Sequence, residues 1–173
     1  MEDRKRRFEA VYAATYDQIL GYAVRRCDSP EDAADVVAET FTVAWRRMDR
    51  LPHGDEARLW LYGVARNVLA NHRRGRRTRT LELDRDIADL YSRTPEHTAE
   101  LSAIAGAFAD LRDDDRELLA LVAWEGLDHE QIAAVLGVSR NAVRIRLHRA
   151  RKRLSKALTT AGITAHHIAL ESL

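Results

Sequence analysis

The 173-residue chain is long enough for one ordinary domain or two small ones. Hydrophobic residues make up 46% of it and charged residues 32%, which is typical of a folded, water-soluble protein and argues against a disordered chain. A single cysteine, Cys27, excludes a disulfide framework, and no apolar run approaches the roughly 20 residues of a membrane span, so we expect a cytoplasmic protein.

The net charge of +1 conceals three blocks of charge. Residues 66–79 contain six arginines and no acid, and residues 140–156 contain eight basic residues and no acid. Between them, residues 80–117 hold eleven acids against four bases. This arrangement predicts two separate contacts with a polyanion and an interval that avoids it. Either basic block alone is equally typical of a solvated helix face.

The residue pattern predicts an all-α protein, because prolines and glycines are few and strand-like alternation is scarce. A first helix is expected over residues 8–26. A second should begin after Ser29, a candidate cap, with Pro30 at the first helical position and Asp32 where a capping box places its acid. Its apolar residues recur at helical spacing: Val37, Phe41, Ala44 and Met48. Residues 49–57 read as a loop.

A third helix is expected from about Arg58 to Arg74. Its buried stripe consists of Leu61, Val64, Ala65 and Val68. At about 100° per residue, a different stripe gathers Trp60, Asn67, Asn71 and Arg74. These side chains suit contact with bases, because an aromatic ring stacks, amides read base edges and arginine binds phosphate. The alternative is that Trp60 packs inward and the asparagines are merely solvated.

Residues 80–99 lose this periodicity and contain Pro95, which predicts an extended, acidic linker. Helical spacing then returns with Leu101, Ile104, Phe108 and Leu111. Asp113 is placed to cap the following helix, which should end near Gly126.

The segment after Asp128 has the features of a helix-turn-helix. Asp128 and Gln131 suit the start of a short helix, Gly137 a tight turn and Ser139 the cap of a longer helix. Ala133 is small enough for the two helices to touch. Apolar residues hold the second helix down: Ile132, Leu136, Val138, Val143 and Leu147, with Ala150 and Leu154 farther along the inward stripe.

The longer helix also carries groups that can read DNA: Arg140, Asn141, Arg144, Ile145, His148 and Arg149. Arginine pairs with guanine, asparagine with adenine, and an exposed isoleucine contacts the thymine methyl. Residues better suited to phosphate are Arg151, Lys152 and Arg153 here, and Arg73, Arg76 and Arg77 in the first basic block. The alternative is an ordinary helical hairpin with a basic face.

Three stretches, DVVAETFTVAWRRM, WLYGVARNVLANHRR and EGLDHEQIAAVLGVSRNAVRIRLHRARKRL, together resemble the second and fourth conserved regions of extracytoplasmic-function (ECF) sigma factors. The resemblance covers about residues 8–157. It implies a region 2-like domain (1–79), a linker (80–99), a region 4-like domain (100–157) and a tail without assigned role (158–173). It also implies that the chain directs core RNA polymerase to promoters and nucleates strand opening.

The resemblance implies a role for each part of the chain. The segment Asp35 to Met48 matches the surface that docks on the clamp helices of the largest polymerase subunit, through Asp35, Glu39, Thr40, Trp45 and Met48. Loop 49–57 with Asn67 and Asn71 matches the part that captures flipped bases of the minus-ten element. The residues that match readers of the duplex minus-thirty-five element are Arg144, Ile145, His148 and Arg149.

Further partners are implied as well: the polymerase flap region and an anti-sigma factor. The acidic linker matches the segment that threads toward the RNA exit channel. Three features depart from the family pattern. Ala38 stands where Gln is usual, Gly63 stands where Arg is usual, and residues 158–173 have no counterpart.

Two other classes of function remain to be compared. An autonomous helix-turn-helix regulator that dimerises on a palindromic operator explains residues 99–157 equally well, but leaves the Trp60–Arg74 stripe without a role. An enzyme would need a phosphate-binding glycine loop, a metal-spaced His/Cys cluster or a nucleophile elbow, and the sequence has none of these. We therefore expect no catalytic residue, no cofactor and no metal.

Overall fold

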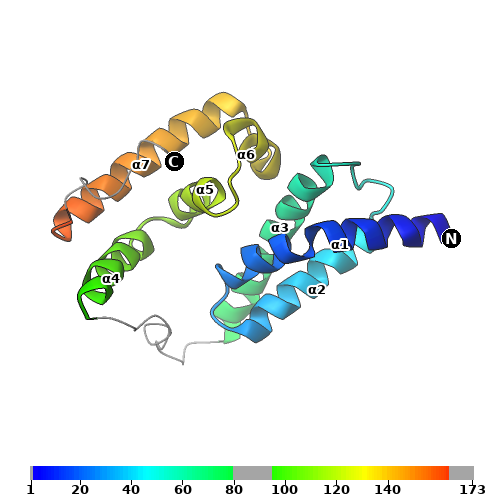
Figure 1. Ribbon diagram of the computed structural model, residues 1–173, viewed down its shortest axis with the longest axis horizontal. Helices are drawn as coiled ribbons and strands as arrows, with labels where there is room; N and C mark the ends of the chain where they lie inside the picture. The colour runs from blue at the N-terminus through cyan, green and yellow to red at the C-terminus, as the bar shows by residue number, and fades with distance from the viewer. Residues whose placement is uncertain (1, 80–94, 164–173) are drawn as a thin grey trace. The chain divides into compact units, whose positions relative to one another are not determined.

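Seven helices account for the regular secondary structure of the described residues, which are 2–79 and 95–163 of this computed structural model (Figure 1). Side chains are described for residues 2–75 and 101–163. The all-α prediction is confirmed. The chain divides near residue 84 into two units with separate helices, as expected of two small helical domains. Within the described ranges, no helix is both long and apolar enough to cross a bilayer.

The first unit packs α1 (Glu2–Val24), α2 (Pro30–Arg46) and α3 (Glu56–Arg79) against one another. The stripe predicted for the second helix is buried at all four positions, although Met48 lies just beyond the end of α2. The stripe of α3 is buried at all but the half-buried Val64. Ser29 caps α2 as predicted, since its Oγ accepts a hydrogen bond from Asp32 N at 3.1 Å. The same Oγ donates to the Asp32 carboxylate at 2.7 Å.

Two helices of this unit are longer than expected. α1 begins at Glu2 rather than at residue 8, and α3 continues to Arg79. The extra turns of α1 are anchored by arginines that reach the end of α2: Arg4 Nη2 donates to Trp45 O at 2.6 Å, and Arg7 bonds to carbonyls beyond α2. Hydrophobic periodicity does not report such polar anchoring, so the sequence placed the start too late.

The second unit arranges α4 (Pro95–Ala109), α5 (Asp113–Ala123) and α6 (His129–Leu136) around the long α7 (Arg140–Thr160). The start of α4 corrects the expected linker. Residues 95–99 are helical, because the fixed φ of Pro95 suits a first helical turn. Residues 80–94 lie outside the described residues, so the extended linker remains a prediction.

The start of α5 is a second correction. Asp113 does not cap the helix, because the cap position is Arg112, which makes no side-chain capping bond. Asp113 lies within the first turn and accepts a bond from Arg116. Three consecutive acids in that turn are favoured there by the helix dipole.

The helix-turn-helix forms as predicted from α6 and α7. Asp128 Oδ1 accepts from Glu130 N and Gln131 N, both at 2.8 Å, and Gln131 Oε1 accepts from Asp128 N at 3.0 Å, which completes the capping box. Gly137 adopts φ 66°, a left-handed conformation that side chains resist. Ser139 Oγ then accepts from Ala142 N at 3.1 Å and starts α7.

The chain just beyond the expected second domain belongs to its core. Leu158 and Ile163 are buried against Ala107 of α4, with half-buried residues around them: Ala103, Ile104, Leu154 and Ala157. The first part of the predicted tail therefore packs on α4. Residues 164–173 lie outside the described residues.

Asp115 is the buried acid of the second unit, with only 3% of its side chain exposed. Arg153 Nη1 on α7 donates to both carboxylate oxygens at 2.9 Å, and Arg112 Nε lies 3.6 Å away. A buried carboxylate is costly unless it is paired, so this contact fastens α7 to α5. The sequence did not predict this partner of Arg153, whose side chain is still 44% exposed, so its phosphate contact remains a prediction.

Asp115→Ala should lower the free energy of unfolding of the second unit by about 2 kcal/mol, the order expected for hydrogen bonds to a charged group. Urea denaturation followed by circular dichroism measures this change. Asp114→Ala is the matched control, since Asp114 is the exposed neighbouring acid, and should change stability by less than about 0.5 kcal/mol. Equal losses in the two variants would contradict the role given to the buried pair.

Candidate nucleic-acid interface

One side of α3 carries the polar groups that the sequence placed together. Asn67, Asn71 and Arg74 are all exposed and follow one another at steps of four and three residues, which is one helix face. Arg74 Nη2 donates to Asn71 Oδ1, so the two side chains form one unit. Trp60 is half-buried, so its ring is shared between the core and the surface. The surface row of α3 therefore has amides and a guanidinium at its centre.

The first basic block continues along the same helix. Arg73 is exposed, and its Nη2 donates to Arg26 O at 3.1 Å. Arg76 and Arg77 lie on the helical backbone of α3, but their side chains are outside the described residues. The C-terminal end of α3 thus adds arginines beyond the row of amides.

The connection between α2 and α3 has two parts: a root, residues 48–52, which is packed against the unit, and an exposed tip, residues 53–56. Met48 and Leu51 are buried, and Leu51 N donates to Arg47 O at 3.1 Å. The tip, residues 53–56, is exposed, and Gly54 turns it with φ 61°. The predicted loop is present, except that its last residues, 56 and 57, belong to α3.

The exposed side of α2 keeps three of the five residues expected to dock on polymerase. Asp35 and Glu39 are exposed one turn apart, and His72 Nε2 of α3 lies 3.9 Å from Glu39 Oε2. Trp45 is 39% exposed, with the Arg4 guanidinium 5.0 Å from its ring centre.

The other two docking residues, Thr40 and Met48, are corrected because both are buried. Thr40 Oγ1 donates to Val36 O at 2.7 Å inside the unit. Thr40 lies one turn beyond Val36, a core residue of α2, so helical spacing directs its side chain inward. Met48 lies in the turn that follows the end of α2 and packs into the core from there.

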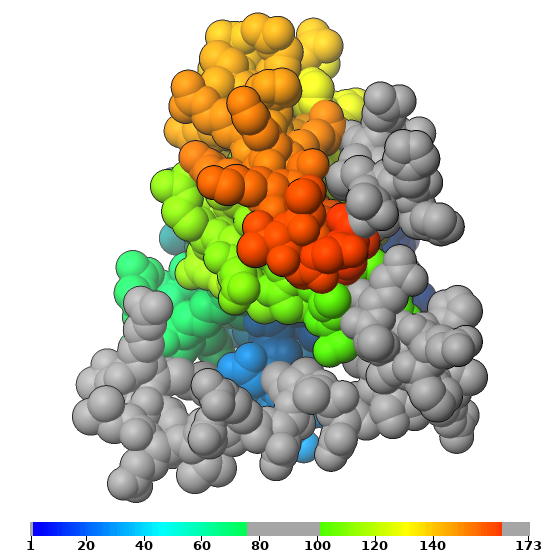
Figure 2. Space-filling view, turned by 90° about the vertical axis from the view of Figure 1, so that its left-hand side faces the viewer, coloured from blue at the N-terminus to red at the C-terminus, as the bar shows by residue number. Residues whose placement is uncertain are grey.

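The outer surface of α7 forms the second candidate contact, and Figure 2 shows this helix, in orange, at the surface of its unit. At about 100° per residue, four exposed residues share one side: Asn141, Arg144, Ile145 and His148. Arg140 and Arg149 are exposed on the two flanks. Arg144 Nη2 donates to Asn141 Oδ1 at 3.1 Å, and Ile145 is 39% exposed. We call the four shared-side residues the α7 reading row.

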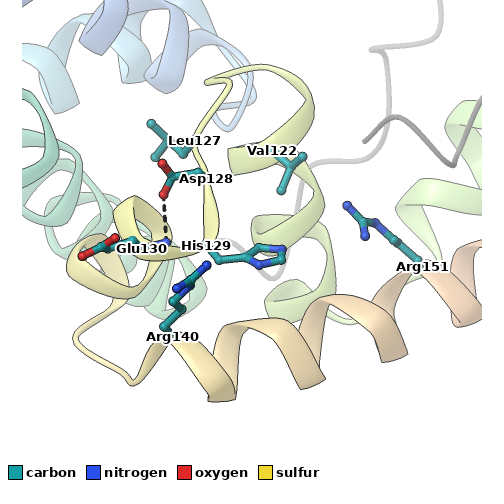
Figure 3. A pocket seen from close by; sticks show the side chains of 7 residues that line it. All are labelled: Val122, Leu127, Asp128, His129, Glu130, Arg140 and Arg151. Atoms are coloured by element: carbon teal, nitrogen blue, oxygen red, sulfur yellow. Dashed lines mark hydrogen bonds between the residues drawn. The ribbon is translucent and has the colours of Figure 1, made fainter.

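A cavity of about 320 Å³ lies beside α7 between the ends of α5 and α6 (Figure 3). Arg140 and Arg151 point into it from α7, with the His129 ring between them (Figure 3). Arg151 Nε is buried and has no hydrogen-bond partner among the described residues. Lys152 is exposed on the helix. Of the phosphate candidates on α7, Arg151 and Lys152 therefore keep donors for an anion.

Sequence reasoning missed two kinds of residue near these surfaces. His129 was given no role, although it lines the cavity. Arg4 and Arg7 were given none either, although they bond across to α2 and the loop. The run of bases at 4–7 was the available signal. No cluster of three or more His, Cys, Asp or Glu placed to hold a metal occurs in the described part of the chain.

Comparison with known proteins gives the family. The family models for sigma-70 region 2 and sigma-70 region 4 match residues 11–79 and 101–154. The ECF RNA polymerase sigma factor SigL of Mycobacterium tuberculosis is 34% identical over 170 residues, covering 90% of this chain and 93% of that protein. The match to region 2 removes the alternative of an autonomous helix-turn-helix regulator, which has no use for the first unit.

Solved structures agree on the architecture. CnrH, solved in complex with the cytosolic domain of CnrY, superposes with a TM-score of 0.63 at 28% identity, over 90% of each chain. The sigma factor RpoE, solved with the anti-sigma factor NepR from Bartonella quintana, shares the fold with a TM-score of 0.63 at 24% identity, over 92% of this chain and 98% of that one. With both conserved regions matched on its two helical units, the chain belongs to the extracytoplasmic-function group of the sigma-70 family of RNA polymerase sigma factors.

Proposed function

We propose that the two units bind two different states of one promoter. The second unit binds the minus-thirty-five element as duplex, and the first unit holds unpaired bases of the minus-ten element. The observation that carries the proposal is the α7 reading row, an exposed set of base-reading side chains on the second helix of a capped helix-turn-helix. A second helix of this kind is the element that enters the major groove.

The chemistry of the reading row suits base edges. Arginine binds guanine through two parallel hydrogen bonds, and asparagine does the same with adenine. Asn141 and Arg144 are already bonded to each other, so less side-chain freedom is lost when DNA binds. Ile145 places an apolar group in a basic surface, where the thymine methyl is a fitting partner. Arg140, Arg149, Arg151 and Lys152 supply positive charge for phosphates around this row.

The first unit offers a different set of contacts. Asn67, Asn71 and Arg74 form a polar row on α3, and the half-buried Trp60 lies toward the loop end of that row. Loop 49–57 leads directly into this end, and its tip carries Asp55 and Glu56. Carboxylates repel phosphate but accept hydrogen bonds from base amino groups, so the tip is suited to an unpaired base.

Strand opening then follows from binding alone. Taking a base out of the stack costs a few kcal/mol, and a site that binds only the free base offsets that cost. Preferential binding of the open state shifts the equilibrium toward it, so neither a nucleotide cofactor nor a catalytic residue is required. The chain itself catalyses no reaction in this proposal.

Core polymerase is the proposed partner of α2, through the exposed residues Asp35, Glu39 and Trp45. The clamp helices of the largest subunit and the flap region are the proposed sites on the enzyme, which the chain would meet in the cytoplasm. An anti-sigma factor is a further proposed partner, supported by the CnrH–CnrY complex of a similar sigma factor.

Transcription in vitro with core polymerase and a library of promoter sequences tests the proposal as a whole. Purified chain and core enzyme should start transcripts from a subset of sequences that share two elements. The chain alone should bind duplex DNA far more weakly than the holoenzyme does. A failure to bind core enzyme, or transcription that starts without sequence preference, would overturn the proposal.

Arg144→Ala should weaken holoenzyme binding to the selected minus-thirty-five duplex by about 1–3 kcal/mol, and the loss should vanish on duplexes altered at one base pair. Arg146→Ala is the matched control, because Arg146 is also exposed but lies about 200° away around α7. Binding is measured by fluorescence anisotropy at fixed salt, because phosphate contacts depend steeply on ionic strength. A loss that is the same for every sequence would reassign Arg144 to a phosphate.

Asn67→Ala should reduce the yield of open complex by about tenfold, the effect of losing roughly 1.4 kcal/mol of binding to the unpaired strand. Binding of the minus-thirty-five duplex should be unchanged, because Asn67 lies on the other unit. Permanganate footprinting of unpaired thymines measures opening. Gln18→Ala, which removes an exposed amide from α1, is the control. Equal losses in opening and duplex binding would refute the assignment.

A further inference from the structure

Arg7 makes an unusual set of contacts at the root of the α2–α3 loop. Its Nη1 donates to Met48 O at 3.3 Å, and its Nη2 donates to Leu51 O and, at 3.4 Å, to Pro52 O. The side chain is half-buried. One guanidinium from the first turns of α1 therefore joins three backbone carbonyls at the point where the chain leaves α2.

These carbonyls need a donor from elsewhere. The three carbonyls lie beyond Arg46, where α2 ends, so they are outside the hydrogen-bond ladder of that helix. A backbone carbonyl away from water needs a donor, and the negative end of the nearby helix dipole also favours a cation. Arginine suits the task because its planar fork offers several donors in fixed directions, whereas a lysine ammonium is a single point. Arg7 thus fixes the path of residues 48–52.

The fixed root ends where the exposed tip begins. Met48 and Leu51 are buried beside the carbonyls that Arg7 binds, whereas residues 53–56 are exposed. A Cβ added at Gly54 would meet no atom within 4 Å, so the space beside this residue is unfilled. Arg7 therefore holds the root of the loop, whereas the tip remains exposed.

We infer that Arg7 is a positioning residue for base capture: it sets the loop so that the tip and the start of α3 face the same unpaired base. This inference rests on the proposed function, because it assigns the loop tip to the minus-ten strand. Arg7 touches no DNA in this scheme and acts through the backbone of residues 48–52. The family model for region 2 begins at residue 11, so Arg7 lies outside the matched segment, whereas the carbonyls that it binds lie inside it.

The test uses holoenzyme assembled from core polymerase and the full-length chain, with a promoter selected from the library. Each unpaired minus-ten position is substituted in turn, and run-off transcription gives the ratio of yield between the preferred base and the others. Arg7→Ala should lower that ratio at the captured position from about tenfold or more to about threefold or less. Core affinity and minus-thirty-five duplex binding should stay as in the wild type.

Two further variants separate positioning from general support. Arg6→Ala removes the same charge from the exposed neighbouring position and should keep the wild-type ratio. Arg7→Lys keeps the charge but loses the fork, and should give an intermediate ratio. If thermal melting shows that Arg7→Ala does not fold, Arg7→Lys becomes the test of the positioning role. An unchanged ratio in Arg7→Lys would then overturn the inference.

Failure of the inference is distinguishable from failure of the proposed function. If Asn67→Ala impairs opening while folded Arg7→Ala keeps the full base ratio, Arg7 is only a structural support and the inference is wrong. If neither variant affects opening or base preference, the assignment of the first unit to the minus-ten strand is itself wrong. The inference is supported if the ratio of yield between bases falls in Arg7→Ala but stays at the wild-type value in Arg6→Ala.

Discussion

The rotation of α7 about its own axis is the constraint on which the DNA-reading surface depends. Val143, Leu147 and Ala150 are buried, so one side of the helix is committed to the core. Because a helix is a rigid cylinder with about 100° between successive side chains, this commitment also decides which residues face outward. The turn at Gly137 and the caps at Asp128 and Ser139 set where the helix begins. The reading row is thus a consequence of core packing and helix start, and not of the basic residues that surround it.

Arginine serves three different purposes in this chain, and only the surroundings tell them apart. Arg153 neutralises the buried Asp115 and fastens α7 to α5. Arg7 supplies donors to backbone carbonyls of the connection that follows α2. Arg144 remains at the surface, bonded only to its neighbour Asn141 among the contacts that are described. A buried charge or carbonyl is costly without a partner, so it binds a nearby guanidinium. A count of basic residues therefore overstates the number available to DNA.

Helix α2 also has one face in the core and one at the surface, and this division limits which of its residues can dock on polymerase. The family resemblance assigned four of its residues and Met48, just beyond its end, to polymerase, but Thr40 and Met48 are in the core of the unit. Asp35, Glu39 and Trp45 remain exposed, with Glu39 beside His72 of α3 and Trp45 beside Phe8 of α1. Arg4 lies over the Trp45 ring from α1, so the N-terminal helix contributes to the same side of the first unit. α1 therefore shapes both the docking face and the loop that leads into α3.

Local chemistry in the sequence determined the helical class, the two-unit division and the starts of α2, α6 and α7, because caps, turn glycines and apolar spacing act within a few residues. The same local reasoning selected Asn67, Asn71, Arg144 and Ile145 as surface residues, and all four are exposed. It placed the starts of α1 and α4 too late, gave Asp113, Thr40 and Met48 the wrong surroundings, and did not find the partner of Arg153. Only the tertiary structure decided the contacts of Arg7 and Arg153, because the groups that pair with them come from residues about forty positions away in the chain. Hydrogen bonds over that separation leave no periodic trace in a sequence.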